Sequence, residues 1–465
     1  MATPSGAPEM ASGAPKLPSN ISQIYDDNVV AKILQVAQRE IQNNKTGDRP
    51  SRFPDTVPQS GPGAGRYICK EKFWTCGFFP GSIYLILERL VKFPDHCAIP
   101  YMNRDSAIAS VRLLAHAWSG GIEWMSGRTD THDLGFLIQL AFQKDWELFG
   151  SEQSLKVLEK AAWSLASRYD PGLGSIRSWN QTANKRYSYT SLEDNFLVII
   201  DSVCNLDLLF YIGYHSKYKS LVEMATSHAH KLRLNHLRPD FSTFHVVNFD
   251  PKSGEVKAKF TAQGYEDQSV WSRGQAWSIL GFAQVYTWTK DPIFLETAIG
   301  CANLFVDKLA TYQGRHHHPF VPPWDFSAPD SHTNEPLRDS SAAVIAAVGM
   351  LHIHSSLALA RPGRDQENID AHGSSFLQTA LRIVSETLDL CLDRDLASFL
   401  SPGAKPSEYD IPVAESGFDA ILRQATAHNN PDAFEPNSDH GSVYADYFTL
   451  EFGNLLLRND FFRLC

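Results

Sequence analysis

The chain has no excess of positive charge and no long basic run. Of its 465 residues, 42 are Lys or Arg and 52 are Asp or Glu, which gives a formal net charge of −10. Nucleic acids and anionic membrane surfaces attract clusters of Lys and Arg, so we expect neither as a partner. The seven cysteines are odd in number and form no C-x-x-C pair. This pattern disfavours a disulfide framework and a zinc finger, and predicts mostly buried thiols.

The N-terminus lacks the charged and apolar regions of a secretory signal. Residues 1–24 are rich in Pro, Gly, Ser and Ala, which predicts a flexible tail. Farther along, no convincing uninterrupted run of about 18 apolar residues predicts a transmembrane helix. We therefore expect a cytoplasmic protein whose residues 25–465 form a single domain.

Strand-like alternation is scarce, and helical periodicity dominates. Apolar residues mostly recur at three- and four-residue spacing, and only 242–250 alternates like a strand. The helix expected after Ser340 is apolar nearly all round, whereas the one at 154–169 has a polar face. This difference predicts an all-α protein with buried inner helices and half-exposed outer helices. Residues 49–65 and 401–412 are predicted to be long loops.

One acid, Asp201, interrupts the strongly apolar stretch at 195–213. If this stretch is helical, apolar side chains such as Leu197 and Cys204 lie one turn away on either side. Burial among them would disfavour the ionised form and raise the pKa of Asp201, which keeps a proton available for general-acid catalysis. The alternative is a structural acid satisfied by an Arg or by the backbone of a neighbouring helix.

A second acid, Asp133, comes just before an apolar helix that is expected to begin near Gly135. An Asp in that place is commonly an N-cap. If Asp133 and Asp201 instead lie at the same end of neighbouring inner helices, they face one cavity as a carboxylate pair. Such pairs are the usual equipment for glycoside chemistry. Both interpretations stay open from the sequence.

The polar, Gly-containing segment 260–282 offers a set of side chains suited to an anionic sugar. Arg273 can make a bidentate contact with a carboxylate, Trp271 can stack on a pyranose face, and Gln263 can bind hydroxyls. The alternative is a helix-entry loop with a surface Arg and a core Trp. His245 can bind a ligand, although a lone His is more commonly structural. The three consecutive histidines at 316–318 predict a loop rather than a metal site.

Several motifs together resemble the unsaturated glucuronyl hydrolases, glycoside hydrolase family 88. They occur in family order across about residues 70 to 452. The motifs are "WTCGFFPG" (74–81), "THDLGF" (131–136), "IIDSVCNLDLLF" (199–210), "QGYEDQSVWSRGQAWSILGF" (263–282), "PWDFSAP" with "RDSSAAVIAAVGML" (323–351) and "YADYFTLE" (444–451). The combination of "WSRGQAW" with the two Asp motifs is the most specific part.

The resemblance implies an (α/α)6 barrel as a single catalytic domain over residues 25–465. It also implies an enzyme that removes the 4,5-unsaturated uronic acid left by polysaccharide lyases at the non-reducing end of oligosaccharides. The implied reaction is hydration of a vinyl ether, in which an acid protonates C4 and water adds at C5. No cofactor and no metal are expected, and the partners are unsaturated uronic-acid oligosaccharides.

The resemblance also assigns roles to the residues singled out above. Asp201 matches the general acid/base of the family, and Asp133 matches its second essential acid. The matching sugar-binding positions are His245, Gln263, Trp271, Arg273, Trp74 and Trp179. The segment between Trp179 and the Asp201 motif is longer than the family pattern, which puts Trp179 in doubt. The long loop 401–442 leaves Ser438 and Ser442 unmatched, so sulfation preference is undetermined.

Three other functions compete with this one. An unsaturated rhamnogalacturonyl hydrolase shares the barrel and the hydration chemistry but accepts pectin-derived disaccharides. A catalytically inactive helical barrel would bind oligosaccharides only. A zinc-dependent α/α-barrel transferase would need an Asp, Cys and His metal set, and no such set is evident in the sequence. Linkage preference, the partner sugar and the oligomeric state are undetermined.

Overall fold

The computed structural model describes residues 17–43, 49–329, 335–359, 366–401 and 411–461. Most of these residues are helical, as predicted, in twelve α-helices. The helices are α1 Asp27–Asn43, α2 Phe78–Lys92, α3 Arg104–Ile122, α4 Leu140–Phe149, α5 Glu152–Ala166, α6 Ser202–His215, α7 Lys219–His236, α8 Ser272–Thr289, α9 Pro292–Ala310, α10 Ser340–Leu359, α11 Gln366–Cys391 and α12 Val443–Arg458. Shorter 3-10 segments are η1 Ser19–Tyr25, η2 Trp74–Gly77, η3 Pro94–His96 and η4 Glu123–Gly127, and η5 Gly135–Gln139 is π-helical.

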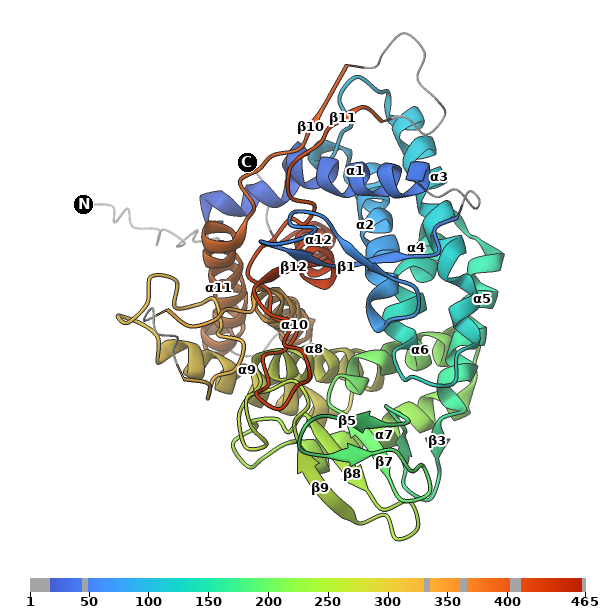
Figure 1. Ribbon diagram of the computed structural model, residues 1–465, viewed down its shortest axis with the longest axis vertical. Coiled ribbons are helices and arrows are strands. Elements are labelled where there is room, and N and C mark those ends of the chain that lie inside the picture. The colour runs from blue at the N-terminus through green and yellow to red at the C-terminus, as the bar shows by residue number, and fades with distance from the viewer. Residues whose placement is uncertain (1–16, 44–48, 330–334, 360–365, 402–410, 462–465) are drawn as a thin grey trace, which may run out of the picture.

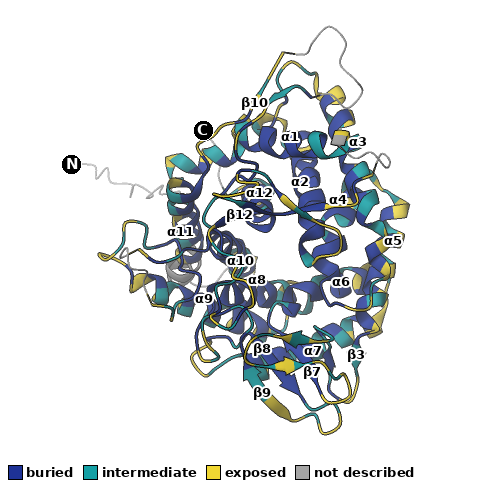
Figure 2. Ribbon diagram, viewed as in Figure 1, coloured by how far each residue is buried: buried dark blue, intermediate teal, exposed yellow. Residues whose placement is uncertain are grey.

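The helices are of two kinds, as the sequence predicts. Helices α2, α8, α10 and α12 are buried on nearly every face, whereas α3, α5, α7 and α9 alternate buried and exposed residues (Figure 2). The even-numbered helices pack on one another, with α12 against α2, α2 against α4, α6 against α8, and α10 against both α8 and α12. They lie nearer the centre of the molecule than the odd-numbered helices (Figure 1). Inner and outer helices are therefore distinct.

Helix α10 shows how strongly the inner positions select apolar residues. By length and composition it could cross a membrane, but 67% of its most apolar 18-residue stretch is buried inside the protein. Its contacts with α8, α11 and α12 provide that burial. A helix that is apolar all round is expected wherever other helices surround it. Helix α10 is therefore a core helix.

Short strands cluster where the chain enters the inner helices. The strands are β1 Phe53–Pro58, β2 Ile68–Lys70, β3 Tyr169–Asp170, β4 Ser175–Ile176, β5 Thr182–Ala183, β6 Ser188–Tyr189, β7 Phe196–Ile199, β8 Val246–Phe249, β9 Val256–Phe260, β10 Ser398–Phe399, β11 Val413–Ala414 and β12 His440–Ser442. Two antiparallel sheets of three strands have the orders β12-β1-β2 and β7-β8-β9. Strand β7 ends just before α6, and β12 ends where α12 begins.

Four local expectations need correction or restriction. The prediction that residues 196–201 are helical is wrong, because Phe196–Ile199 pairs with β8 as a strand. The strand expected at 242–250 is confirmed for β8. The loop expected at 49–65 contains β1, whose partner β12 lies far away in the sequence. Of the loop expected at 401–412, residues 402–410 lie outside the described residues.

The predicted flexible tail is too long. Residues 19–25 form a 3-10 helix, in which Ile21 and Ile24 are fully buried. Two apolar anchors in a short segment are enough to hold it against the core, which the Pro- and Ser-rich composition concealed. Residues 1–16 lie outside the described residues, and the single-domain organisation stays a prediction.

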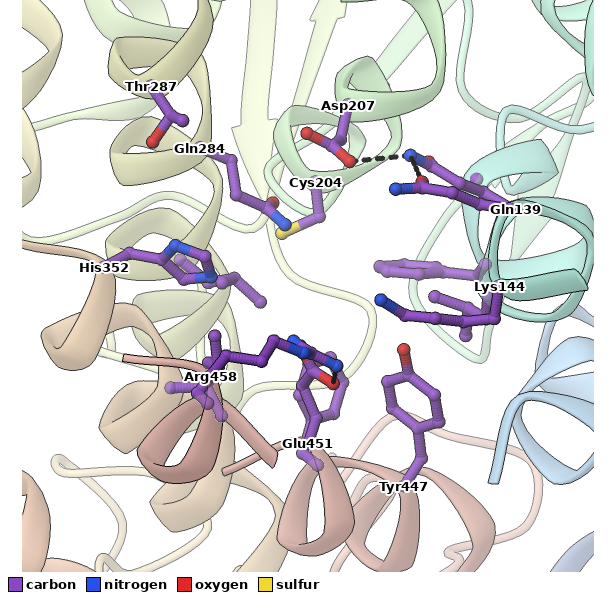
Figure 3. Close-up of a pocket in the computed structure, with 18 of the residues that line it drawn as sticks. Gln139, Lys144, Cys204, Asp207, Gln284, Thr287, His352, Tyr447, Glu451 and Arg458 are labelled. Carbon is purple, nitrogen blue, oxygen red and sulfur yellow. Dashed lines mark hydrogen bonds and ion pairs between the residues drawn. The ribbon is translucent and has the colours of Figure 1, made fainter. Parts of the chain in front are cut away.

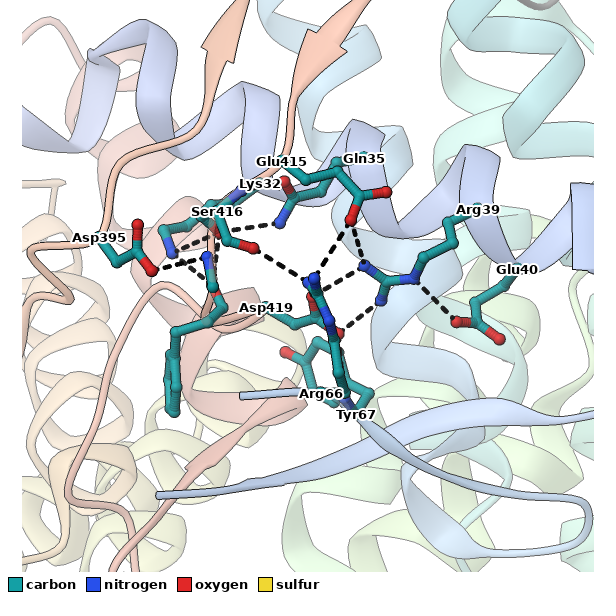
Figure 4. Close-up of polar contacts among 12 residues, drawn as sticks. Lys32, Gln35, Arg39, Glu40, Arg66, Tyr67, Asp395, Glu415, Ser416 and Asp419 are labelled. Carbon is teal, nitrogen blue, oxygen red and sulfur yellow. Dashed lines mark hydrogen bonds and ion pairs between the residues drawn. The ribbon is translucent and has the colours of Figure 1, made fainter. Parts of the chain in front are cut away.

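A buried network of charges joins the first helix to a segment near the C-terminus. In α1, Lys32 donates to Asp393 at 2.6 Å, and both side chains are buried. Asp419 accepts from Arg39 at 2.5 Å and from Arg66 at 2.8 Å (Figure 4). Buried charges persist when they are paired in this way. The network holds the two distant parts of the chain together beside the β12-β1-β2 sheet.

Two predictions about individual side chains are confirmed. Six cysteines lie in the described residues, all are free, and all but Cys69 are buried. Cys465 lies outside the described residues. The histidines at 316–318 lie in turns and bends between α9 and α10, as expected for a loop.

Candidate active site

Asp201 lies in the turn between β7 and α6, immediately before the first residue of α6. Its side chain is 18% exposed. Its Oδ1 atom is buried and has no hydrogen-bond partner. The alternative of an acid fully satisfied by an Arg or by backbone groups therefore does not fit. Because β7 ends at Ile199, the apolar surroundings come from a strand end and a helix start rather than from one continuous helix.

Asp133 lies just before η5, and its side chain points to its own loop. The Thr131 hydroxyl donates to Asp133 Oδ2. No side-chain hydrogen bond caps η5, and the Leu137 N–H instead reaches the Asp133 carbonyl oxygen at 2.8 Å. The N-cap interpretation is therefore wrong for this carboxylate.

His132 lies between the two acids, and the sequence analysis missed it. Its Nε2 atom is 3.2 Å from Asp133 Oδ1 and 3.6 Å from Asp201 Oδ1. The imidazole is 1% exposed. The two acids are thus brought together across one buried ring, which confirms that they form a pair at the same end of the inner helices. The signal was present in "THDLGF", where His132 precedes Asp133.

The two carboxyl groups have opposite pKa shifts. Burial raises the pKa of Asp201 to about 6, and the charge of Asp133 adds to the rise, while His132 and Arg273 oppose it. Burial also acts to raise the pKa of Asp133, but the charge of His132 and hydrogen bonds from His132 and Thr131 outweigh it, so the pKa is lowered. Burial acts to lower the pKa of His132, but the charge of Asp133 outweighs it and raises that pKa. Paired groups with separated pKa values are typical of an acid and its partner.

Arg273 is buried at the start of α8 and is already engaged by the protein. Its Nη1 donates to Asp339 at 3.0 Å and to the Thr426 carbonyl at 2.6 Å, and its Nη2 donates to Gln263 and to the Ala427 carbonyl. Only Nε is without a partner. The predicted bidentate fork to a substrate carboxylate therefore does not fit this arrangement, and the surface-Arg alternative is wrong because the side chain is 1% exposed.

His245 and Trp271 form the wall beside Arg273. The guanidinium lies 4.7 Å from the Trp271 ring centroid, and the His245 ring is 4.5 Å from the same indole. His245 Nδ1 accepts from the Ala262 and Gln263 N–H groups at 3.1 and 3.3 Å, so its proton resides on Nε2. Burial, with the charge of Arg273, lowers the pKa of His245 to about 3. This imidazole is a neutral donor whose Nε2 has no protein partner.

An open cavity of about 710 Å³ is lined by Asp133 but not by Asp201. Four predicted residues line it, namely Trp74, Asp133, Trp179 and Gln263. Trp179 is held by backbone bridges to Thr131 and Leu197, so the longer segment after it does not displace it. Further lining residues that the sequence analysis missed are Lys72, Phe73, Arg128, Asp130, Thr131, Asn180, Gln181, Thr182, Thr190 and Leu192.

The charges at the cavity mouth largely cancel. Asp130 lies 2.9 Å from Lys72 and 2.9 Å from Arg128. At the end of β12, Ser442 accepts from the Ala445 N–H and is therefore a helix cap. An amphiphilic cavity with two indole rings and a few charged groups suits a sugar that carries one carboxylate.

Comparison with known proteins agrees with this geometry, although no family model matches the chain. The chain is 31% identical to the unsaturated chondroitin disaccharide hydrolase of Streptococcus pyogenes serotype M1 over 428 residues, 91% of this chain and 90% of the relative. It is 32% identical to the unsaturated glucuronyl hydrolase of Formosa agariphila over 61% of this chain, a match that spans 64% of that protein's length.

A solved structure shows the same fold. The unsaturated glucuronyl hydrolase of Bacillus sp. GL1, which is responsible for the degradation of glycosaminoglycan, superimposes with a TM-score of 0.70 and 25% identity. The superposition covers 92% of this chain and 95% of that one. The mostly helical fold and the near full-length similarity agree, and the chain belongs to the unsaturated glucuronyl hydrolase family.

Proposed function

We propose that this protein removes the 4,5-unsaturated uronic acid from the non-reducing end of glycosaminoglycan-derived oligosaccharides. The observation that carries the proposal is the pair Asp133 and Asp201 on either side of His132, with Asp133 lining a cavity that has tryptophan walls. Membership of the family supplies the reaction class, and relatives that are named for unsaturated chondroitin disaccharides support the substrate class.

Asp201 is the proposed general acid. With a pKa of about 6 it retains a proton in mildly acidic solution, and its side chain is 18% exposed although Oδ1 is buried. Protonation of C4 of the vinyl ether develops positive charge at C5 and the ring oxygen. The Asp201 carboxylate then accepts a proton from the water that adds at C5. The hemiketal opens, and the remaining oligosaccharide leaves.

Asp133 is proposed to stay ionised and to act on the charge of the neighbouring His132. Its carboxylate favours the charged form of His132. The negative charge of Asp133 in turn favours the positive charge that develops on the sugar. Trp74 and Trp179 are proposed to stack on the sugar, with Gln263 on its hydroxyls. We propose that the neutral His245 donates from Nε2, and that Arg273 acts by positioning Trp271 and Gln263.

The architecture is proposed to be an (α/α)6 barrel. The contacts among the six even-numbered helices and the half-exposed faces of the odd-numbered ones support this arrangement. Each of β7 and β12 leads into an inner helix, so the acids and the cavity lie at one end of the ring. A single catalytic domain and a cytoplasmic location stay predictions.

The unsaturated rhamnogalacturonyl hydrolase is the main competing function. It would use the same acids, and the partner sugar alone would differ. The curated relatives reported above are glucuronyl and chondroitin enzymes, which favours the glycosaminoglycan class. The zinc-dependent transferase has less support, because no group of three His, Cys, Asp or Glu residues is placed to hold a metal within the described ranges.

The test is to mix the purified protein with unsaturated disaccharides from hyaluronan, chondroitin, heparin and pectin digests. Absorbance of the conjugated double bond reports hydration, and the saturated counterparts serve as controls. We expect loss of absorbance with glycosaminoglycan disaccharides and little or none with the pectin product. Faster turnover of the pectin product would favour the rhamnogalacturonyl function, and no turnover of any unsaturated uronide would leave an inactive binding protein.

A further inference from the structure

A second cavity, of about 270 Å³, lies among the inner helices. Asp207 in α6 lines it, about two helical turns beyond Asp201. The other walls come from η5 and α4, α8, α10 and α12 (Figure 3). The second cavity is thus enclosed by inner helices, including α6, whose first residue follows Asp201.

A layer of aromatic rings separates the two cavities. Phe136 lies 5.9 Å from Trp74, which lines the active-site cavity, and 5.0 Å from Trp277 (ring centroids). Trp277 in turn lies 5.5 Å from Phe448. Phe136 and Phe448 line the second cavity from the other side. The second cavity is therefore a compartment of its own.

The charged groups that line the second cavity have partners in the protein, and the carboxyl group of Asp207 accepts from Trp288 and Gln139. Lys144 lies 3.2 Å from Glu147, and Arg458 lies 2.6 Å from Glu451 and 2.5 Å from Glu88. A bound anion or cation would have to compete with these pairs. The second cavity is therefore suited to an uncharged ligand.

Several polar groups still point into the second cavity. Gln284 Oε1 is buried without a hydrogen-bond partner. His352 and Tyr447 face the same space from α10 and α12 (Figure 3). Burial lowers the pKa of His352, so its ring is neutral and offers one donor and one acceptor. Acceptors and donors on opposite walls match hydroxyl groups, which donate and accept at once.

An aromatic edge completes the second cavity. The indole N–H of Trp288 donates to Asp207 at 2.6 Å, which fixes the ring beside the cavity. The Tyr214 ring stacks on that indole with centroids 5.5 Å apart, and Tyr214 is 48% exposed. Rigid aromatic rings next to hydrogen-bonding groups are typical of sites for amphiphilic ligands such as sugars.

We propose that the second cavity binds one neutral sugar ring at a site separate from the candidate active site. Its volume lies just below the usual range for ligand pockets, which favours a monosaccharide over a longer chain. The paired charges favour an uncharged sugar over a uronate. This inference does not depend on the proposed function, because none of the groups that carry it belongs to the acid pair.

The test uses the full chain with N-acetylgalactosamine and glucose as neutral probes and glucuronate as the charged comparison. Binding is measured by titration calorimetry in the wild type, in Gln284→Met, and in the control Gln313→Met, which makes the same change on an exposed turn. We expect a neutral sugar to bind about tenfold more weakly to Gln284→Met, because a hydrogen bond is lost at nearly constant volume. The control should bind as the wild type does.

A second variant keeps the test decisive if Gln284→Met does not fold. Thr287 is an exposed residue at the cavity, so Thr287→Tyr should block entry without repacking the core. A crystal soaked in the bound sugar should show it between Gln284 and His352. The proposal is overturned by no saturable binding, by a sugar found only in the active-site cavity, by equal binding to the blocked variant, or by glucuronate being the better ligand. Binding at crystal concentration only also overturns it.

Discussion

The two ends of the inner helices use carboxylates in opposite ways. At the end that holds the acids, Asp201 has a buried oxygen without a partner, and burial raises the pKa of Asp201 to about 6. Near the other end, buried Glu88 accepts from Arg458 and Asn454. Burial acts to raise the pKa of Glu88, but these contacts and Lys144 lower it to about 2. An unpaired acid keeps a proton to transfer at a cost in stability, whereas a paired acid stabilises the fold.

The largest expected effect is the loss of turnover in Asp201→Asn. The amide keeps the volume of the side chain but cannot deliver a proton, so kcat should fall about 10²- to 10⁴-fold. The measurement is the absorbance assay with an unsaturated disaccharide. Asp307→Asn, on an exposed position of α9, is the matched control and should turn over normally. Near-normal turnover of Asp201→Asn would contradict the assignment of the acid.

Next in size is the loss of stability in Glu88→Gln. Removing one charge from a buried, hydrogen-bonded group should lower the free energy of unfolding by about 3–5 kcal/mol at neutral pH. Since the folded-state pKa of Glu88 lies below its ordinary value of 4.5, this contribution is present above pH 4.5 and is lost as the pH falls toward 2. Urea unfolding of the wild type and of Glu88→Gln at several pH values measures this difference in the free energy of unfolding. Unchanged stability, or a large loss of kcat in the folded variant, would contradict the conclusion that Glu88 is a structural acid and Asp201 a catalytic one.

A smaller effect of opposite sign is expected for the stability of Asp201→Asn. The folded-state pKa of Asp201 is raised from 3.8 to about 6, so the ionised group destabilises the fold above pH 6. The amide should raise the free energy of unfolding by up to about 3 kcal/mol at pH 8. The gain should shrink through pH 6 and vanish near pH 4. A variant that is less stable than the wild type at pH 8 would show that Asp201 is a paired, structural acid.

The smallest effect is a shift of the pH profile. Because Asp201 must be protonated, kcat/KM of the wild type should fall as the pH rises through about 6. The charge of His132 lowers the pKa of Asp201, so His132→Gln should move this fall to higher pH. A pH series of kcat/KM in both proteins measures the difference. If kcat/KM of the wild type and of His132→Gln falls at the same pH, His132 does not act on Asp201.

Residues with strong local signals were placed correctly from the sequence. Ser340–Leu359 is apolar on nearly every face, as expected for a helix that other helices surround. Two of the motifs contain the acids, Asp133 and Asp201, and the structure brings these acids together on either side of His132. Local patterns failed where the partner is remote, because β1 pairs with β12 and Phe196–Ile199 pairs with β8.

The sequence by itself determined the helical class, the family and the two acids, since periodicity and short motifs are local properties of the chain. Only the tertiary structure decided what each side chain does. His132 became the bridge because two loops meet around it, and Arg273 became a positioning residue because Asp339, Thr426 and Ala427 surround it. The proton on Asp201 and the pairing of Glu88 depend on burial and on neighbours from other helices. Those interactions arise only when distant segments pack together.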